Sequence, residues 1–273
     1  MTTRLLEVKH VTKRFGGLAA VSSINMAIDR GELVGLIGPN GAGKTTVFNL
    51  LTGVYVPTEG TIHFDGRLMN RCKPYQIVRA GMARTFQNIR LFRQLTARDN
   101  VKVAAQLRCR CGLISSLCRT PRSLANDRQV NQIADELLDV MNLQDVADAR
   151  AGDLAYGLQR RLEIARALAT RPRLLLLDEP AAGMNPQEKV DLMALIQKIR
   201  RDFDLTVLLI EHDMKLVMGI CERIYVLDYG QIIAEGAPSR IRRDPRVIKA
   251  YLGEEYGDVE SDTGTGFSVR TEV

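Results

Sequence analysis

Gly38-Pro39-Asn40-Gly41-Ala42-Gly43-Lys44-Thr45 is the most informative stretch of this 273-residue sequence. It fits the pattern GxxxxGK[ST], in which glycines let the backbone curl so that successive amide groups point at phosphate oxygens. The ammonium group of Lys44 would reach the outer phosphates of a nucleotide, and the hydroxyl of Thr45 would bind Mg²⁺. The alternative is an ordinary glycine-rich turn. The flanking sequence distinguishes such a turn from a phosphate loop.

The residues on both sides of this stretch have the pattern that a phosphate loop requires. Residues 32–37 form a short apolar run that ends at Gly38, which predicts a buried strand. Val47, Leu50 and Leu51 lie on one face of the next segment, which predicts a helix that ends near Gly53. A helix that starts here directs the positive end of its dipole at the bound anion. The sequence therefore predicts a nucleotide site between a strand and a helix.

A second motif consists of four aliphatic residues followed by two acids, Leu174-Leu175-Leu176-Leu177-Asp178-Glu179. The aliphatic run predicts a buried strand, and open α/β sheets bind ligands at the carboxyl ends of their strands. Asp178 is suited to a Mg²⁺ shell, and Glu179 could orient or deprotonate an attacking water. The acids could instead cap a helix, but the phosphate-binding motif favours the catalytic interpretation.

The composition is ordinary for a globular protein, with 45% hydrophobic and 26% charged residues. The net charge of +6 is compatible with anionic ligands or a position near a membrane and is diagnostic of neither. No apolar run approaches the roughly 18 to 20 residues that span a bilayer. The first 15 residues lack the apolar core of a signal peptide, so we expect a protein that stays in the cytoplasm. Reduced thiols, rather than a zinc site, are expected for the five cysteines, Cys72, Cys109, Cys111, Cys118 and Cys221.

The remaining segments give a coarser picture. Alternating apolar residues between Leu6 and Ile28 predict strands, and the Asp65-Gly66 dipeptide predicts a hairpin turn after residues 61–64. Residues 106–128 are polar and basic and are interpreted as a surface excursion, after which helical spacing begins at Val130. The acidic segment from Glu254 onward predicts a disordered tail.

The two motifs, with a long helical region between them, resemble the ATPase subunits of ABC transporters. Residues 154–159, Leu-Ala-Tyr-Gly-Leu-Gln, resemble the family's signature loop, and Arg84-Thr85-Phe86-Gln87 resembles its Q-loop. Residues 182–185 resemble the D-loop, and His212 resembles the switch histidine that follows a strand. The resemblance covers residues 5 to about 253, which is nearly the whole chain.

This resemblance implies an α/β fold: a P-loop NTPase (ABC ATPase) core with an antiparallel β subdomain and an inserted α-helical subdomain. Residues 1–253 would form the ABC ATPase domain, with the core in residues 1–87 and 161–253. The helical subdomain would occupy residues 88–160, and the acidic tail residues 254–273.

The resemblance also implies which residues bind ATP and Mg²⁺. Glu179, His212 and Gln87 would be catalytic, and Thr45, Gln87 and Asp178 would hold the metal ion. Phe15 would stack on adenine, and the other nucleotide contacts would come from Gly38, Pro39, Asn40, Gly41, Ala42, Gly43, Lys44, Thr45, Thr46, Ala155, Tyr156 and Gly157. The signature departs from the family at three positions, because Ala155 replaces Ser, Tyr156 replaces Gly and Leu158 replaces Gln. Gly157 is retained, and its amide near a helix start keeps the favourable dipole.

A narrower likeness is to the longer of the two ATPase subunits of bacterial branched-chain amino acid importers. It is carried by the stretches ARTFQ, LAYG, DEPAAG and IEHDMKLVM and by the insertion at residues 106–128. It implies a heterodimer with a second homologous ATPase subunit, two integral membrane permease subunits and a periplasmic or extracellular substrate-binding protein. The chain would then lie at the cytoplasmic face of the inner membrane, and no nucleic acid is expected as a partner. Importers of urea and short amides have similar ATPases and stay as an alternative.

Other classes of protein fit less well. DNA-repair ATPases of this type insert long coiled coils, translation factors fuse two cassettes in one chain, and a GTPase should carry an Asn-Lys-x-Asp motif. None of these features is found in the sequence. Residues 89–95, which mix apolar and basic side chains, could receive a short helix of a partner or pack within the domain.

Overall fold

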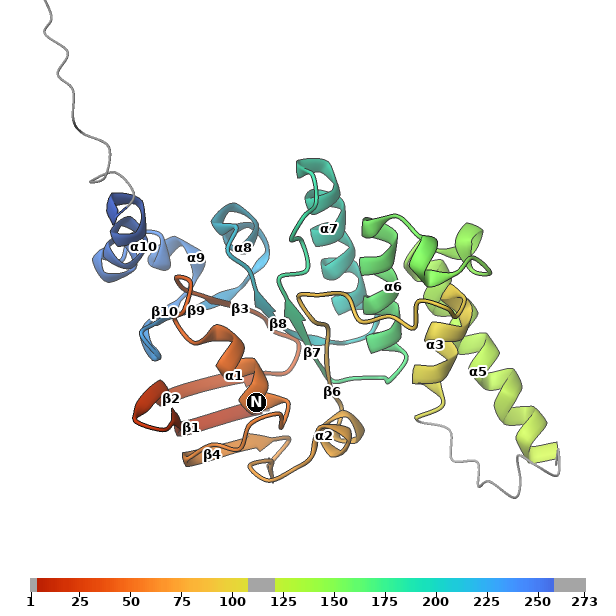
Figure 1. The fold of residues 1–273 in the computed structure, drawn as a ribbon, viewed down its shortest axis with the longest axis horizontal. Helices are drawn as coiled ribbons and strands as arrows, with labels where there is room; N and C mark the ends of the chain where they lie inside the picture. Colours follow the sequence, from red (N-terminus) through yellow and green to blue (C-terminus); the bar gives the residue numbers. More distant parts are fainter. Residues whose placement is uncertain (1–3, 108–120, 258–273) are drawn as a thin grey trace, which may run out of the picture.

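A six-stranded sheet forms the centre of the computed structural model, which describes residues 4–107 and 121–257 (Figure 1). In the order β10-β9-β3-β8-β7-β6, the strands are Gln231–Gly236, Arg223–Asp228, Leu33–Ile37, Thr206–Ile210, Leu174–Asp178 and Met82–Arg84. All neighbouring strands are parallel except β9 and β10, which pair antiparallel. Every residue of β3, β7 and β8 is buried, as expected for strands that are covered on both faces.

A smaller antiparallel sheet lies against one face of the central sheet. Its order is β2-β1-β4-β5, with β1 at Arg4–Phe15, β2 at Leu18–Asp29, β4 at Glu59–Phe64 and β5 at Arg67–Leu68. The predicted hairpin is confirmed, because Asp65 and Gly66 join β4 to β5 with φ angles of 50° and 75°. Helix α1 (Lys44–Leu51) buries Phe48 in the apolar cluster that this sheet shares with Leu36 of β3.

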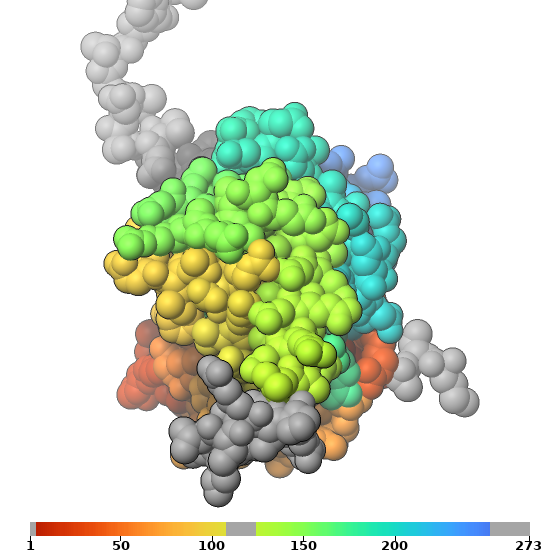
Figure 2. Space-filling view, turned by 90° about the vertical axis from the view of Figure 1, so that its right-hand side faces the viewer, coloured from red at the N-terminus to blue at the C-terminus, as the bar shows by residue number. Residues whose placement is uncertain are grey.

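Helices cover the other face of the central sheet. Leu175 and Leu177 of β7 belong to an apolar cluster that also contains Leu162 of α6 and Leu192 of α7. The helices α3 (Ala97–Ala105), α5 (Pro121–Val140) and α6 (Tyr156–Leu168) form a group at one end of the molecule (Figure 1). Helices α3 and α5 lie side by side on the surface that Figure 2 shows. The same cluster runs from these three helices to the sheet, so this helical group shares its core with the central sheet.

The remaining helices are α2 (Pro74–Ala80), α7 (Pro186–Asp202), α8 (Met214–Ile220), α9 (Pro238–Ile241) and α10 (Pro245–Gly257). Short 3₁₀ turns occur at Gln144–Val146 and Ala151–Asp153. No helix within the described residues is both long enough and apolar enough to cross a membrane.

The expected α/β fold with its two sheets is confirmed, and two segments differ from the expectations. Helix α5 begins at Pro121, nine residues before the predicted start at Val130, so residues 121–128 of the predicted surface excursion are helical. Residues 254–257, predicted as disordered tail, continue α10; Glu254 and Glu255 are good helix formers, which favours this extension. Cys109, Cys111 and Cys118 lie outside the described residues. Helix α6 is continuous across the predicted boundary between residues 160 and 161.

Candidate functional site

The phosphate-loop motif lies between β3 and α1, as the sequence predicts. Gly43 has a φ angle of 107°, and a Cβ atom there would lie 2.7 Å from the carbonyl oxygen of Ala20. A Cβ atom on Gly38 would lie 2.0 Å from the carbonyl oxygen of Leu227. These two positions therefore accept only glycine, because the loop runs directly against the backbone of β2 and β9.

Lys44 is buried at the first position of α1. Its ammonium group donates to the carbonyl oxygens of Gly38, at 2.5 Å, and Pro39, at 2.8 Å. The lysine is thereby held across the loop, with its charge beside these two carbonyl oxygens. Thr45 is exposed and Thr46 half-buried on the same first turn.

Asp178 ends β7 and is almost completely buried. Its Oδ2 atom accepts a hydrogen bond from Arg84 Nη2 at 2.7 Å, and Arg84 Nη1 also donates to Asn49 of α1 at 2.7 Å. Arg84 therefore links the strand end that carries the predicted metal ligand to the helix that follows the phosphate loop. In the sequence, Arg84 is one residue of the Q-loop motif, and no local pattern predicts this contact.

The side chains of Glu179 and its two predicted catalytic partners, Gln87 and His212, lie close together. Gln87 Nε2 donates to Glu179 Oε2 at 2.7 Å, and His212 Nδ1 lies 3.8 Å from the same oxygen. Glu179 has a φ angle of 45°, and its N–H donates to the carbonyl oxygen of Ile210 at the end of β8. The structure thus places the three side chains at the carboxyl ends of β7 and β8, where α/β sheets bind ligands.

A buried carboxyl that was not predicted as a site residue supports this arrangement. Glu211 is 1% exposed, and its Oε1 atom accepts a hydrogen bond from the N–H of Ala181 at 2.9 Å. Burial raises the pKa of Glu211, and the hydrogen bond from Ala181 opposes the rise. Glu211 therefore fixes the backbone two residues after Glu179. The neighbouring His212 gave the only signal in the sequence that could have drawn attention to this position.

Ala155, Tyr156 and Gly157 lie at the start of α6 in the helical group, whereas the phosphate loop precedes α1 beside the antiparallel sheet (Figure 1). Ala155 is the N-cap residue and makes no hydrogen bond through its side chain to the first turn. The first N–H groups of a helix have no acceptor within the helix. This end of α6 can therefore offer backbone donors and a dipole to an anion.

Phe15 is 44% exposed at the end of β1. Its ring packs edge to face against Tyr55, with 5.1 Å between ring centroids, and the Lys13 ammonium lies 5.1 Å from the Phe15 centroid. Tyr55 and Lys13 were not predicted as site residues. Both contact a ring that stays exposed, and the face of an exposed aromatic ring can stack on a planar base.

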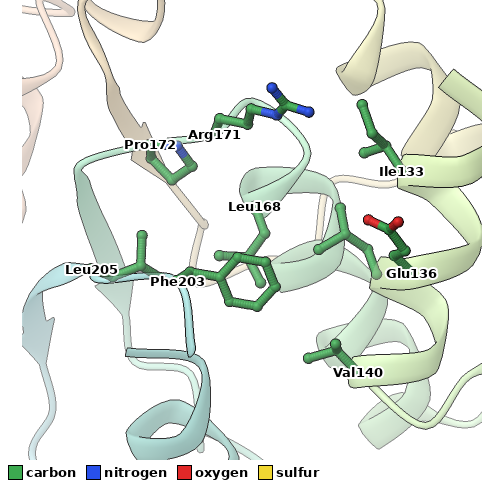
Figure 3. Close-up of a pocket in the computed structure, with 9 residues that line it drawn as sticks. Ile133, Glu136, Val140, Leu168, Arg171, Pro172, Phe203 and Leu205 are labelled. Atoms are coloured by element: carbon green, nitrogen blue, oxygen red, sulfur yellow. The ribbon is translucent and has the colours of Figure 1, made fainter. Parts of the chain in front are cut away.

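The structure also contains an apolar pocket of about 630 Å³ that belongs to a different edge of the sheet (Figure 3). Its wall includes Leu168, Pro172, Phe203 and Leu205, with Glu136 of α5 across from them. Pro172 and Leu205 precede β7 and β8, so this pocket lies at the amino ends of those strands. None of the predicted site residues lines it, which leaves the carboxyl edge as the candidate site.

The donor set fits a hard cation such as Mg²⁺. Thr45, Asp178 and Gln87 offer hydroxyl, carboxylate and amide oxygens, and Mg²⁺ in phosphate sites uses one or two carboxylates together with phosphate oxygens. No cluster of three His, Cys, Asp or Glu side chains that could hold a metal by itself occurs in the described residues. The oxygens therefore suit a metal ion that arrives with a nucleotide.

Comparisons with known proteins show the family of the chain. The model of the "ABC transporter" family matches residues 21–182, and the model described as "Branched-chain amino acid ATP-binding cassette transporter" matches residues 231–257. The chain is 51% identical to the high-affinity branched-chain amino acid transport ATP-binding protein BraF of Pseudomonas aeruginosa. It is 49% identical to LivG of Escherichia coli, described in the same words. Each match covers 93% of this chain and 100% of the relative.

Solved structures of ATP-binding cassettes also match the chain. The ADP conformation of MJ1267, an ATP-binding cassette of an ABC transporter, matches with a TM-score of 0.78 and 27% identity over 92% of this chain and all of that one. The dimeric structure of MJ0796, a bacterial ABC transporter cassette, matches with a TM-score of 0.73 and 27% identity over 86% of this chain and 99% of that one. The fold, the phosphate loop and these relatives together show that the chain belongs to the ATPases of the ABC transporter family.

Proposed function

We propose that this chain binds and hydrolyses ATP with Mg²⁺ at a head-to-tail dimer interface and thereby drives the uptake of leucine, isoleucine and valine. The observation that carries the proposal is the meeting of Gln87, Glu179 and His212 beside Asp178 at one edge of the sheet. A carboxylate, an amide and an imidazole in contact are suited to positioning and deprotonating a water.

Each residue would have a defined task in the reaction. The phosphate loop and Lys44 would bind the triphosphate, and Phe15 would stack on the adenine. Thr45, Asp178 and Gln87 would hold Mg²⁺, which neutralises charge on the phosphate oxygens when it is bound. Glu179 would accept the proton of the attacking water, while Gln87 keeps its carboxylate oriented and His212 approaches the γ-phosphate.

The start of α6 would complete the site of a second chain. Ala155, Tyr156 and Gly157 belong to the helical group, so they would contact the ATP that a partner's phosphate loop holds. ATP would close the two chains on each other, and hydrolysis would release them, as in other switches controlled by the γ-phosphate. The likeness to the dimeric MJ0796 cassette supports such an assembly. The partner would be a second, homologous ATPase subunit.

The membrane partners would be two permease subunits, served by an external substrate-binding protein, with this chain at the cytoplasmic face of the membrane. Residues 89–95 supply a surface for a permease helix: Phe92 is 49% and Leu95 37% exposed, and Arg166 lies 5.3 Å from the Phe92 ring. Exposed apolar residues rimmed by basic ones suit an amphipathic helix. The names of BraF and LivG support branched-chain amino acids as the cargo.

The experiment measures uptake of labelled leucine, isoleucine and valine by cells that lack this gene and every redundant importer. The cells are complemented with the wild-type chain or with Glu179→Gln. We expect the wild type alone to restore uptake, because losing a general base slows turnover by about 10²- to 10⁴-fold. Uptake unchanged by the deletion would contradict the cargo and direct the search to urea and short amides. Restoration by Glu179→Gln would instead contradict the role of Glu179.

A further inference from the structure

Among the described residues, Arg160 has the largest fully buried side chain. It lies on α6, one turn after the signature residue Tyr156. Its Nη2 atom donates to the carbonyl oxygen of Gln87 at 2.7 Å and to the Tyr156 hydroxyl at 3.2 Å. Its Nη1 atom donates to the carbonyl oxygen of Phe86 at 2.6 Å and to Glu163 at 2.7 Å. One guanidinium therefore binds both the signature residue Tyr156 and the backbone of the Q-loop.

Glu163, one turn further along α6, accepts hydrogen bonds from the backbone of the same loop. Its Oε1 atom accepts hydrogen bonds from the N–H groups of Phe86 and Arg90, each at 3.3 Å, and its side chain is 3% exposed. The Arg160–Glu163 pair thus contacts both the N–H and the carbonyl group of Phe86. The segment from Phe86 to Arg90 is held to α6 through its backbone, whatever its side chains do.

A buried ion pair of this kind is a poor source of stability. Removing two charges from water costs about as much as their attraction returns, and apolar residues of similar size often serve a core equally well. The Nε atom of Arg160 is buried without a hydrogen-bond partner, which adds to this cost. The pair is therefore better explained by the position it imposes on the loop than by a contribution to folding.

We propose that Arg160 is a positioning residue that makes the Q-loop and the start of α6 one rigid unit. The unit joins Gln87, whose amide contacts Glu179 in this chain's own site, to Gly157, which would face the nucleotide of the partner. Through it, a displacement of α6 at one nucleotide moves Gln87 at the other. This inference rests on the proposed ATPase function and adds a link between its two sites.

Arg160→Lys tests the link, because lysine keeps the charge but cannot reproduce the planar, two-sided donor geometry of a guanidinium. Arg161→Lys is the matched control: Arg161 is the next residue, is half-buried, and lines a hollow with Asp191 and Leu195 of α7 on another face of α6. Lys44→Ala is the control for nucleotide binding. The measurements are ATP-Mg affinity by calorimetry, hydrogen exchange of residues 85–91 and melting temperature for the full chain, and steady-state ATP hydrolysis by the chain assembled with the proposed second ATPase subunit.

For Arg160→Lys we expect ATP-Mg affinity close to that of the wild type and a lower melting temperature, because lysine leaves buried acceptors of the Q-loop without a donor. We also expect amide exchange of Phe86 and Arg90 at least tenfold faster, and kcat at least tenfold lower with KM changed less than threefold. A purely structural role would speed up exchange throughout the chain and would weaken ATP-Mg binding as well. If Arg160→Lys fails to fold, Glu163→Gln decides, with faster exchange at the same two amides and a lower kcat expected.

If Arg160→Lys and Arg161→Lys show equal exchange rates and equal kcat values, the proposed link is wrong, while the ATPase function still stands. A wild-type chain that binds ATP no better than Lys44→Ala would instead contradict the proposed function itself. The two failures are therefore distinguishable.

Discussion

Glu179 adopts a backbone conformation that few residues other than glycine take up, with a φ angle of 45°. Such strain costs about 1 to 3 kcal/mol and persists where surrounding contacts determine it. Here the N–H of Glu179 donates to Ile210, and its carboxylate accepts from Gln87. The strained residue is also the predicted catalytic base, which is where proteins tend to keep such conformations.

The thiol of Cys221 is a second residue whose environment gives a testable prediction. Cys221 is 6% exposed, and burial, assisted by the nearby carboxylate of Glu222, raises its pKa from 9.0 to about 12. A raised pKa means that the native state holds this proton more tightly than the unfolded one. The corresponding stability is therefore present below pH 9 and is lost as the pH rises towards 12.

We expect iodoacetamide at pH 9 to modify Cys221 at least tenfold more slowly than the half-buried Cys72, because the thiolate is the reactive form. Mass spectrometry of the two peptides measures the rates. In the unfolded chain in urea the two rates should become similar. Equal rates in the native chain would show that Cys221 is accessible.

Helix starts show which elements could be predicted from sequence. Helix α7 begins at Pro186 because Asn185 accepts from the N–H of Glu188 while the Glu188 carboxylate accepts from that of Asn185. Asp213 caps α8 in a similar way. These signals lie within four residues of sequence, so such helix starts can be predicted from the sequence alone. The early start of α5 at Pro121 has no apolar periodicity to mark it, which is why the prediction began at Val130.

The same distinction applies to the site. Its motif residues could be predicted because each motif is local in sequence. The contacts of Arg84 with Asp178 and of Arg160 with Phe86 join residues 94 and 74 positions apart and depend on how the sheet and α6 pack. A single sequence contains no signal for such pairs. The motif residues could therefore be proposed from the sequence, whereas the contacts that orient them had to be seen in the structure.

The start of α3 gives a prediction for a single element. The Thr96 hydroxyl accepts a hydrogen bond from the N–H of Asp99 at 3.0 Å, which satisfies one of the helix's first donors. We expect Thr96→Ala to lower the free energy of unfolding by about 1 kcal/mol. Urea denaturation measures the change, and Thr96→Ser, which keeps the hydroxyl, should lose less than half as much. Equal losses in the two variants would assign the effect to the methyl group rather than to the cap.

On the scale of the whole molecule, the two halves of the proposed nucleotide site lie on different parts of the chain. The phosphate loop leads into α1, which packs between the two sheets, and the signature residues lie at the start of α6 in the helical group (Figure 1). The two apolar clusters reach opposite faces of the central sheet, so the sheet separates these parts. A head-to-tail dimer would bring each half to the complementary half of the partner. Nucleotide binding and subunit association are then one equilibrium.

This equilibrium gives the last prediction, for Gly157 near the start of α6. An acid there favours the helix dipole but would repel the phosphates of a nucleotide held by the partner. A Cβ atom at Gly157 would lie 3.7 Å from Glu188 Oε1, an ordinary contact, so Gly157→Ala is the matched control. We expect a tagged Glu179→Gln chain, co-expressed with the second ATPase subunit that we propose as its partner, to retain that subunit in ATP. Adding Gly157→Asp should abolish its retention, and adding Gly157→Ala should not. Co-purification with and without ATP measures the association, and retention by Gly157→Asp would place the signature residues outside the interface.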